Sequence, residues 1–137
     1  LDTYTFDRVA GKDIYHNGVP SATDNSTGAL VSNTGTTLGH FRAIPIYWFQ
    51  GDLAEVIVFD RALTAAERLR VETQLAGKYG LAVQVDSYVP CNGPWADHAH
   101  YVREHLRVVD QFILNRLLTV AQAKAAHAAA QASSCGG

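Results

Sequence analysis

The chain has 137 residues, of which 47% are hydrophobic and 18% are charged, and its formal net charge is -2. This length suits one ordinary domain, or a smaller domain with an appended segment, and the composition supplies enough apolar residues for a core. Basic and acidic residues are nearly balanced, at 11 against 13, which argues against electrostatic binding of nucleic acid. No run of about 18 apolar residues occurs, so the sequence predicts no membrane span.

The first part of the chain, up to about residue 59, has the composition of β structure, rich in Thr, Ser, Tyr and Val between turn residues. We expect strands at Thr3–Phe6 and Asp13–His16, and the second runs into the two-residue turn signal Asn17-Gly18. Residues 21–37 are mostly Ser, Thr, Asn and Gly, which predicts a long exposed loop. Strand-like character then resumes over Leu38–Trp48.

The most strongly apolar stretch is Leu53–Phe59, interrupted by Glu55, and it predicts a central strand with little access to solvent. A helix should follow, because Thr64 and Glu67 have the spacing of a capping box and Gly80 supplies a C-terminal stop. Apolar residues recur at every fourth position of this helix: Val71, Leu75 and Tyr79.

The composition changes after residue 81, from β-forming to helix-forming residues. Residues 86–94, with two prolines, predict a connector. Beyond Trp95 an amphipathic stripe predicts a first helix, and Thr119 with Gln122 forms a second capping box that starts an alanine-rich helix over about 120–132. Two helices joined by almost no loop form an antiparallel hairpin. The stripe of the first helix consists of Val102, Leu106, Val109, Ile113 and Leu117.

The two cysteines lie at the two ends of this hairpin. Cys91 precedes the first helix and Cys135 follows the second, and an antiparallel arrangement brings those ends together. We therefore predict a Cys91–Cys135 disulfide that closes the open end of the hairpin, with two unpaired thiols as the alternative. A structural disulfide predicts an extracytoplasmic location.

The first part of the chain also carries a family resemblance. Residues 51–64 (GDLAEVIVFDRALT), with Glu67-Arg68 and Lys78-Tyr79-Gly80-Leu81 after them, resemble the closing segment of bacterial laminin-G-like jelly rolls, of the concanavalin A-like lectin/glucanase group. Tyr15–Val19 resembles the family's earlier hairpin, and Leu38-Gly39 its short strand before the last one. The resemblance covers about Leu1–Leu81 and implies a two-sheet β-sandwich whose curved sheet often binds glycans. The second half resembles a short helical module that follows such domains in some secreted bacterial proteins.

The expected fold class is therefore α+β. We expect a partial antiparallel β-sandwich of the jelly-roll type with one helix over residues 1–84, a linker over 85–94, and a disulfide-closed helical hairpin over 95–137. The family's unit is longer than this segment, so the strand at Leu53–Phe59 would expose apolar edges and faces. We expect another segment of the protein, or a neighbouring copy or chain, to complete the sandwich by strand complementation.

Two sets of side chains are candidates for catalytic or metal-binding groups. Paired carboxylates on one strand face hydrolyse glycosidic bonds, but Asp52 and Glu55 are three residues apart and an extended strand would direct them to opposite faces. The densest ligand-type cluster is Asp97, His98, His100 and His105, whose spacing does not suit a zinc site on one helix. We expect solvated or capping roles for this cluster, and a protein that is not an enzyme.

Binding residues are predicted from aromatic and carboxylate side chains. Tyr47, Trp48 and Phe49 are candidates for stacking on sugar rings, with a place in the core as the alternative. The resemblance brings calcium into consideration as a cofactor, and Asp24, Asn25 and Asp52 offer oxygen ligands of the kind that calcium uses. No other cofactor is indicated.

Two classes of function follow from these observations. We expect a non-catalytic, secreted or cell-surface module for glycan binding and adhesion, whose partner is a glycan or cell-surface polymer. The alternative is a structural subunit of an extracellular assembly or filament, whose incomplete sandwich is completed by another segment or chain. Nucleic acid is expected in neither case.

Overall fold

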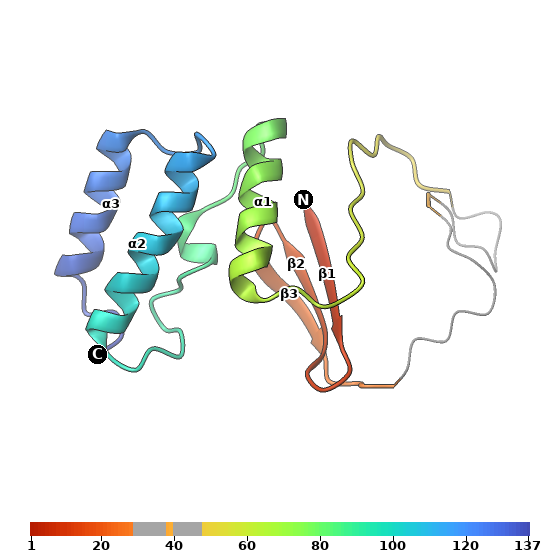
Figure 1. Cartoon of the computed structure of the whole chain (residues 1–137), viewed down its shortest axis with the longest axis horizontal. Helices are drawn as coiled ribbons and strands as arrows, with labels where there is room; N and C mark the ends of the chain where they lie inside the picture. The colour runs from red at the N-terminus through yellow and green to blue at the C-terminus, as the bar shows by residue number, and fades with distance from the viewer. Residues whose placement is uncertain (29–37, 40–47) are drawn as a thin grey trace.

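The computed structural model describes residues 1–28, 38–39 and 48–137. In these residues a three-stranded antiparallel sheet, with strands β1 (Asp2–Asp7), β2 (Gly11–His16) and β3 (Val19–Asp24), is followed by helices. The helices are α1 (Ala65–Tyr79), the short 3-10 helix η1 (Val85–Ser87), α2 (His98–Leu114) and α3 (Val120–Ala132). Figure 1 shows α1 between the sheet and the α2–α3 hairpin. The α+β class is confirmed, whereas no second sheet that would make a jelly-roll sandwich is seen among the described residues.

The sheet is built on a tight hairpin turn at Asn17-Gly18, as the sequence predicts. Both residues have positive φ, 50° and 82°, which is the backbone that a two-residue primed turn requires. The sequence placed residues 21–24 in a loop, and this was wrong, because β3 pairs with β2 as far as Lys12↔Asp24. Thr and Ser tolerate an edge strand well, and Pro20 fits there because its missing N–H is not needed on the outer side.

The predicted central strand at Leu53–Phe59 was wrong. The segment is a coil, and its side chains are exposed, with Leu53 at 54% and Val58 at 87%. A strand needs a neighbour for its backbone, and none of the described strands pairs with this segment. Figure 1 shows it as the drawn-out yellow-green trace that leads into α1. The other predicted strand, Leu38–Trp48, lies for the most part outside the described residues.

Helix α1 begins and ends where the sequence predicts. The Thr64 hydroxyl accepts a hydrogen bond from the Glu67 backbone N–H, the Glu67 carboxylate accepts one from the Thr64 N–H, and Gly80 ends the helix in the left-handed conformation. The buried face differs from the predicted stripe, because Leu69, Thr73 and Ala76 are buried while Tyr79 is exposed.

The core lies among the helices rather than in the sheet. It consists of Leu69, Val89, Tyr101, Val108, Phe112, Ala130 and Cys135. Of the stripe predicted for α2, Val109 is buried but Leu106 is 38% exposed. The helix turns its aromatic residues Tyr101 and Phe112 inward, because they bury more apolar surface than the aliphatic residues beside them.

The predicted disulfide between Cys91 and Cys135 is present, with 4.7 Å between the two Cα atoms. It closes the open end of the α2–α3 hairpin, where the ring of His98 also lies 2.8 Å from the carbonyl oxygen of Cys135. The bond is consistent with an oxidising setting. In the described residues, no helix is both long and apolar enough to cross a lipid bilayer.

A stacked arginine and a close glycine contact join the sheet to the helical part of the chain. The guanidinium of Arg68 on α1 lies 3.7 Å from the centre of the Tyr15 ring on β2. The same guanidinium lies 5.7 Å from the centre of the Tyr88 ring. Gly18 packs so closely on Tyr88 that a Cβ there would lie 2.6 Å from its ring atoms. These contacts fix the sheet against α1 by one face and leave the other face open.

Candidate functional site: the open face of the sheet

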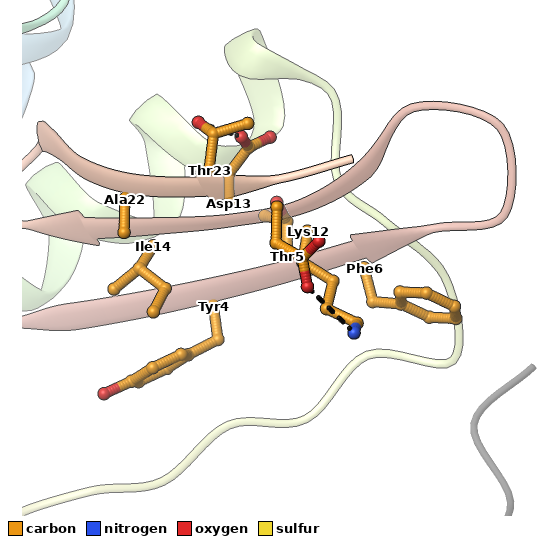
Figure 2. A pocket seen from close by; sticks show the side chains of 9 residues that line it. Tyr4, Thr5, Phe6, Lys12, Asp13, Ile14, Ala22 and Thr23 are labelled. Atoms are coloured by element: carbon orange, nitrogen blue, oxygen red, sulfur yellow. Dashed lines mark hydrogen bonds and ion pairs between the residues drawn. The ribbon is translucent and has the colours of Figure 1, made fainter. Parts of the chain in front are cut away.

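The two faces of the sheet differ in what covers them. Strand register places Tyr4, Phe6, Lys12, Ile14, Ala22 and Asp24 on one face. The opposite face carries Thr5, Asp13 and Thr23, and it also carries Tyr15, which stacks on Arg68 of α1. Figure 2 shows Tyr4, Ile14 and Ala22 directed away from Asp13 and Thr23. The Tyr4 face is therefore the one that α1 leaves uncovered.

A shallow hollow of ≈ 350 Å³ lies on the sheet and is lined by residues of all three strands (Figure 2). Its apolar surface comes from Tyr4, Phe6, Ile14 and Ala22. Tyr4 is 71% exposed, which is a large value for an aromatic side chain within a strand. The hollow thus presents an accessible ring beside a small apolar floor.

A polar cluster borders the hollow. The Lys12 ammonium lies 3.3 Å from a carboxylate oxygen of Asp24, the ion pair dashed in Figure 2, and 2.8 Å from the Ser26 hydroxyl. Asp24 also accepts hydrogen bonds from the Ser26 hydroxyl, at 2.7 Å, and from the Ser26 backbone N–H, at 2.9 Å. The bonds from Ser26, followed by that from Lys12, lower the pKa of Asp24, so its carboxylate is ionised at neutral pH. The cluster offers an ammonium, a carboxylate and a hydroxyl at fixed positions.

The predicted aromatic triplet is partly described. Trp48 is 62% exposed and Phe49 is 55% exposed, and the Phe49 ring packs over Gly51. Tyr47 lies outside the described residues. Trp48 and Phe49 are therefore accessible to a ligand, and they stay candidates for stacking.

The candidate calcium ligands are not gathered into a metal site. Asp24 is engaged by Lys12 and Ser26, Asn25 follows it in the coil, and Asp52 is exposed. Within the part of the chain that the structure describes, no three or more His, Cys, Asp or Glu side chains are placed to hold a metal ion. Calcium binding stays a prediction.

The histidine cluster near Asp97 takes structural roles. Asp97 caps α2 and accepts a hydrogen bond from the His100 backbone N–H at 2.6 Å. The Nδ1 of His100 accepts one from the Ala96 N–H, and the His98 ring bridges to carbonyl oxygens at the end of α3. The carboxylate of Glu55 accepts hydrogen bonds from Lys78 and Tyr79 at the end of α1.

The open face was not predicted from the sequence. Its signal was the alternation of Tyr4 and Phe6 two residues apart, with Ile14 opposite Tyr4 in the next strand. Comparisons with protein-family models, with curated proteins and with solved structures find no match to this chain. The laminin-G-like resemblance therefore stays a prediction, and function is argued from the site itself.

Proposed function

We propose that the chain is a non-catalytic module for glycan binding and adhesion, in a secreted or cell-surface protein, and that the sugar lies on the open face of the sheet. The observation that carries the proposal is Tyr4, which is 71% exposed on that face. Sugar rings have apolar C–H faces and polar hydroxyl edges, so they suit an accessible aromatic ring with charged groups at its border.

The polar cluster supports this proposal. Asp24 is an ionised acceptor and Lys12 a donor, and both lie on the face that carries Tyr4. Hydrogen bonds to charged groups are stronger than those between neutral groups, and fixed geometry lets them discriminate between hydroxyl orientations. These groups would set specificity while the Tyr4 ring supplies contact area.

The charge arrangement also favours binding over hydrolysis. The carboxylates on this face are each paired with a base, Asp24 with Lys12 at 3.3 Å and Asp2 with His16 at 2.7 Å. A glycosidase needs one carboxylic acid that donates a proton and a second carboxylate free to attack or to activate water. The disulfide supports a secreted setting, since such bonds persist in oxidising compartments.

The test is a glycan-array screen, followed by calorimetric titration of the best oligosaccharide with the wild-type chain and two variants. We expect Tyr4→Ala to weaken binding by roughly tenfold or more, about the loss expected when an aromatic contact is removed. Phe49→Ala is the matched control, because Phe49 is a second exposed ring and belongs to the triplet singled out in the sequence. If Phe49→Ala abolished binding and Tyr4→Ala did not, the site would lie on the triplet; the absence of any glycan ligand would overturn the proposal.

A second candidate function has its own supporting observation. The apolar segment Leu53–Phe59 is exposed along its whole length. Large exposed apolar surfaces on soluble proteins mark sites of protein contact. This observation favours the structural-subunit alternative, in which another polypeptide covers the segment. Light scattering coupled to size exclusion tests it, because an assembly is expected and a well-folded monomer that binds no apolar dye would contradict it.

A further inference from the structure

The segment Leu53–Phe59 has the composition of a buried strand in an exposed position. Leu53, Val56, Ile57 and Phe59 are each between 45% and 54% exposed, and Val58 is 87% exposed. Between residues that the structure describes, its backbone makes no hydrogen bond. The segment therefore combines an apolar surface with backbone N–H and C=O groups that no described residue pairs.

The segment is held in place beside α1 by polar contacts near its ends. The Glu55 carboxylate lies 2.9 Å from the Lys78 ammonium and accepts a hydrogen bond from the Tyr79 hydroxyl at the end of α1. Just after the segment, the two terminal guanidinium nitrogens of Arg61 donate to the Glu67 carboxylate in the first turn of α1, at 2.9 and 2.7 Å. The two contacts place the segment antiparallel to the helix. A chain fixed in this way loses less conformational entropy when a ligand binds to it.

The charges beside the segment indicate which kind of partner would suit it. Asp52 precedes it and Asp60 follows it, both are exposed, and in the described part of the chain neither forms an ion pair. An antiparallel pair of two copies centred on Val56 would place Asp52 of each copy opposite Asp60 of the other. Like charges directly opposite destabilise a strand pair, whereas opposite charges stabilise it.

We propose that Leu53–Phe59 is an acceptor for an incoming β-strand of a partner polypeptide, apolar in its centre and carrying Lys or Arg at both ends. This inference rests on the structural-subunit alternative and names the partner that it requires. The partner's backbone would pair with the N–H and C=O groups that have no partner among the described residues. Its apolar side chains would cover Val56 and Val58, and its basic ends would face Asp52 and Asp60.

The test uses the whole chain and a synthetic peptide of alternating valine and threonine with a lysine at each end. We expect saturable binding in fluorescence anisotropy, with tighter binding than the same peptide carrying glutamate ends or a central proline. Asp60→Lys should weaken binding of the lysine-ended peptide by about tenfold and improve that of the glutamate-ended one. Asp110→Lys is the matched control, because it makes the same charge change at an exposed position of α2, and it should leave both affinities unchanged.

Three outcomes would overturn the inference: no binding, equal binding of lysine- and glutamate-ended peptides, or binding that survives the central proline. Concentration-dependent dimerisation that masks the segment would assign it to a second copy instead. Light scattering separates this failure from failure of the assembly function, because a chain that assembles without binding any peptide would retain the function and lose only the acceptor strand. Glycan titration tests the binding site on the sheet separately, and its result does not depend on whether the peptide binds.

Discussion

His105 is a titratable group inside the helical core. It lies on α2, is 4% exposed, and its Nδ1 has no hydrogen-bond partner among the described residues. Asp86 of η1 and His127 of α3 face it, and the Tyr101 ring lies 5.9 Å from its ring. Burial lowers the pKa of His105, with a smaller contribution from Asp86 that raises it and one from His127 that lowers it.

This pKa predicts acid-dependent stability. The unfolded chain takes up a proton near its ordinary pKa of about 6.5, whereas the folded chain does so only at lower pH. The contribution of neutral His105 is therefore fully present above about pH 6.5 and falls as the pH decreases through the folded pKa. Urea unfolding across this range should show the decline, and His105→Gln should flatten it. His16→Gln, at an exposed imidazole, is the control, and an equal flattening there would contradict the assignment.

Arg68 and Glu72 form a buried ion pair on α1. Arg68 is 9% exposed, Glu72 is 1% exposed, and one guanidinium nitrogen lies 3.1 and 3.0 Å from the two carboxylate oxygens. We expect Glu72→Ala to lower the free energy of unfolding by about 3–5 kcal/mol, because it leaves a buried charge without its partner. The double variant Arg68→Met/Glu72→Leu should recover much of that loss in thermal unfolding. A double variant less stable than Glu72→Ala would mean that the Arg68 stacking on Tyr15 dominates.

Two aliphatic residues of the predicted stripe test which face of α2 packs into the core. Val109 is 2% exposed and Leu106 is 38% exposed. Val109→Ala should lower the free energy of unfolding by about 2 kcal/mol, since it leaves a cavity, and Leu106→Ala by less than about 1 kcal/mol. Thermal unfolding measures both. Equal losses would show that α2 presents the aliphatic stripe to the core.

Local signals predicted element boundaries well. The capping boxes at Thr64 and Thr119 and the turn at Asn17-Gly18 involve residues no more than four apart, so their geometry is decided by the sequence itself. The face of α2 was less predictable, because two apolar stripes overlap there. The buried stripe has the same helical spacing as the aliphatic stripe and consists of Tyr101, His105, Val108 and Phe112. Because it includes a histidine, it does not read as apolar in the sequence.

The disulfide could be predicted across 44 positions, but the burial of Leu53–Phe59 and the open face of the sheet could not. Leu53–Phe59 has the composition of a central strand, but burial of a strand requires neighbouring strands, and none of the described strands pairs with it. The candidate site is a similar case. The alternation of Tyr4 and Phe6 indicates a two-sided strand, but the face that α1 leaves open is decided by Arg68 stacking on Tyr15, far along the chain.

The disulfide connects two residues that are 44 positions apart in the chain. Replacing both cysteines, as Cys91→Ser/Cys135→Ser, should lower the free energy of unfolding by ~4 kcal/mol, because the unfolded chain gains the freedom that the closed loop denied it. Chemical denaturation measures the loss. Mass spectrometry of the native wild-type chain should find both cysteines blocked to alkylation, and full labelling would contradict the bond.

The same bond makes residues 91–135 a covalently closed ring that contains both helices of the hairpin. A protease that cuts the turn between α2 and α3 would open the backbone without releasing a fragment, because the disulfide still joins the two pieces. The helices would stay packed through Val108 and Ala130, and the nicked chain would separate on a denaturing gel only after reduction. Outside the cell, where proteases are common and reductants scarce, such a ring would let the hairpin outlast a break in its own main chain.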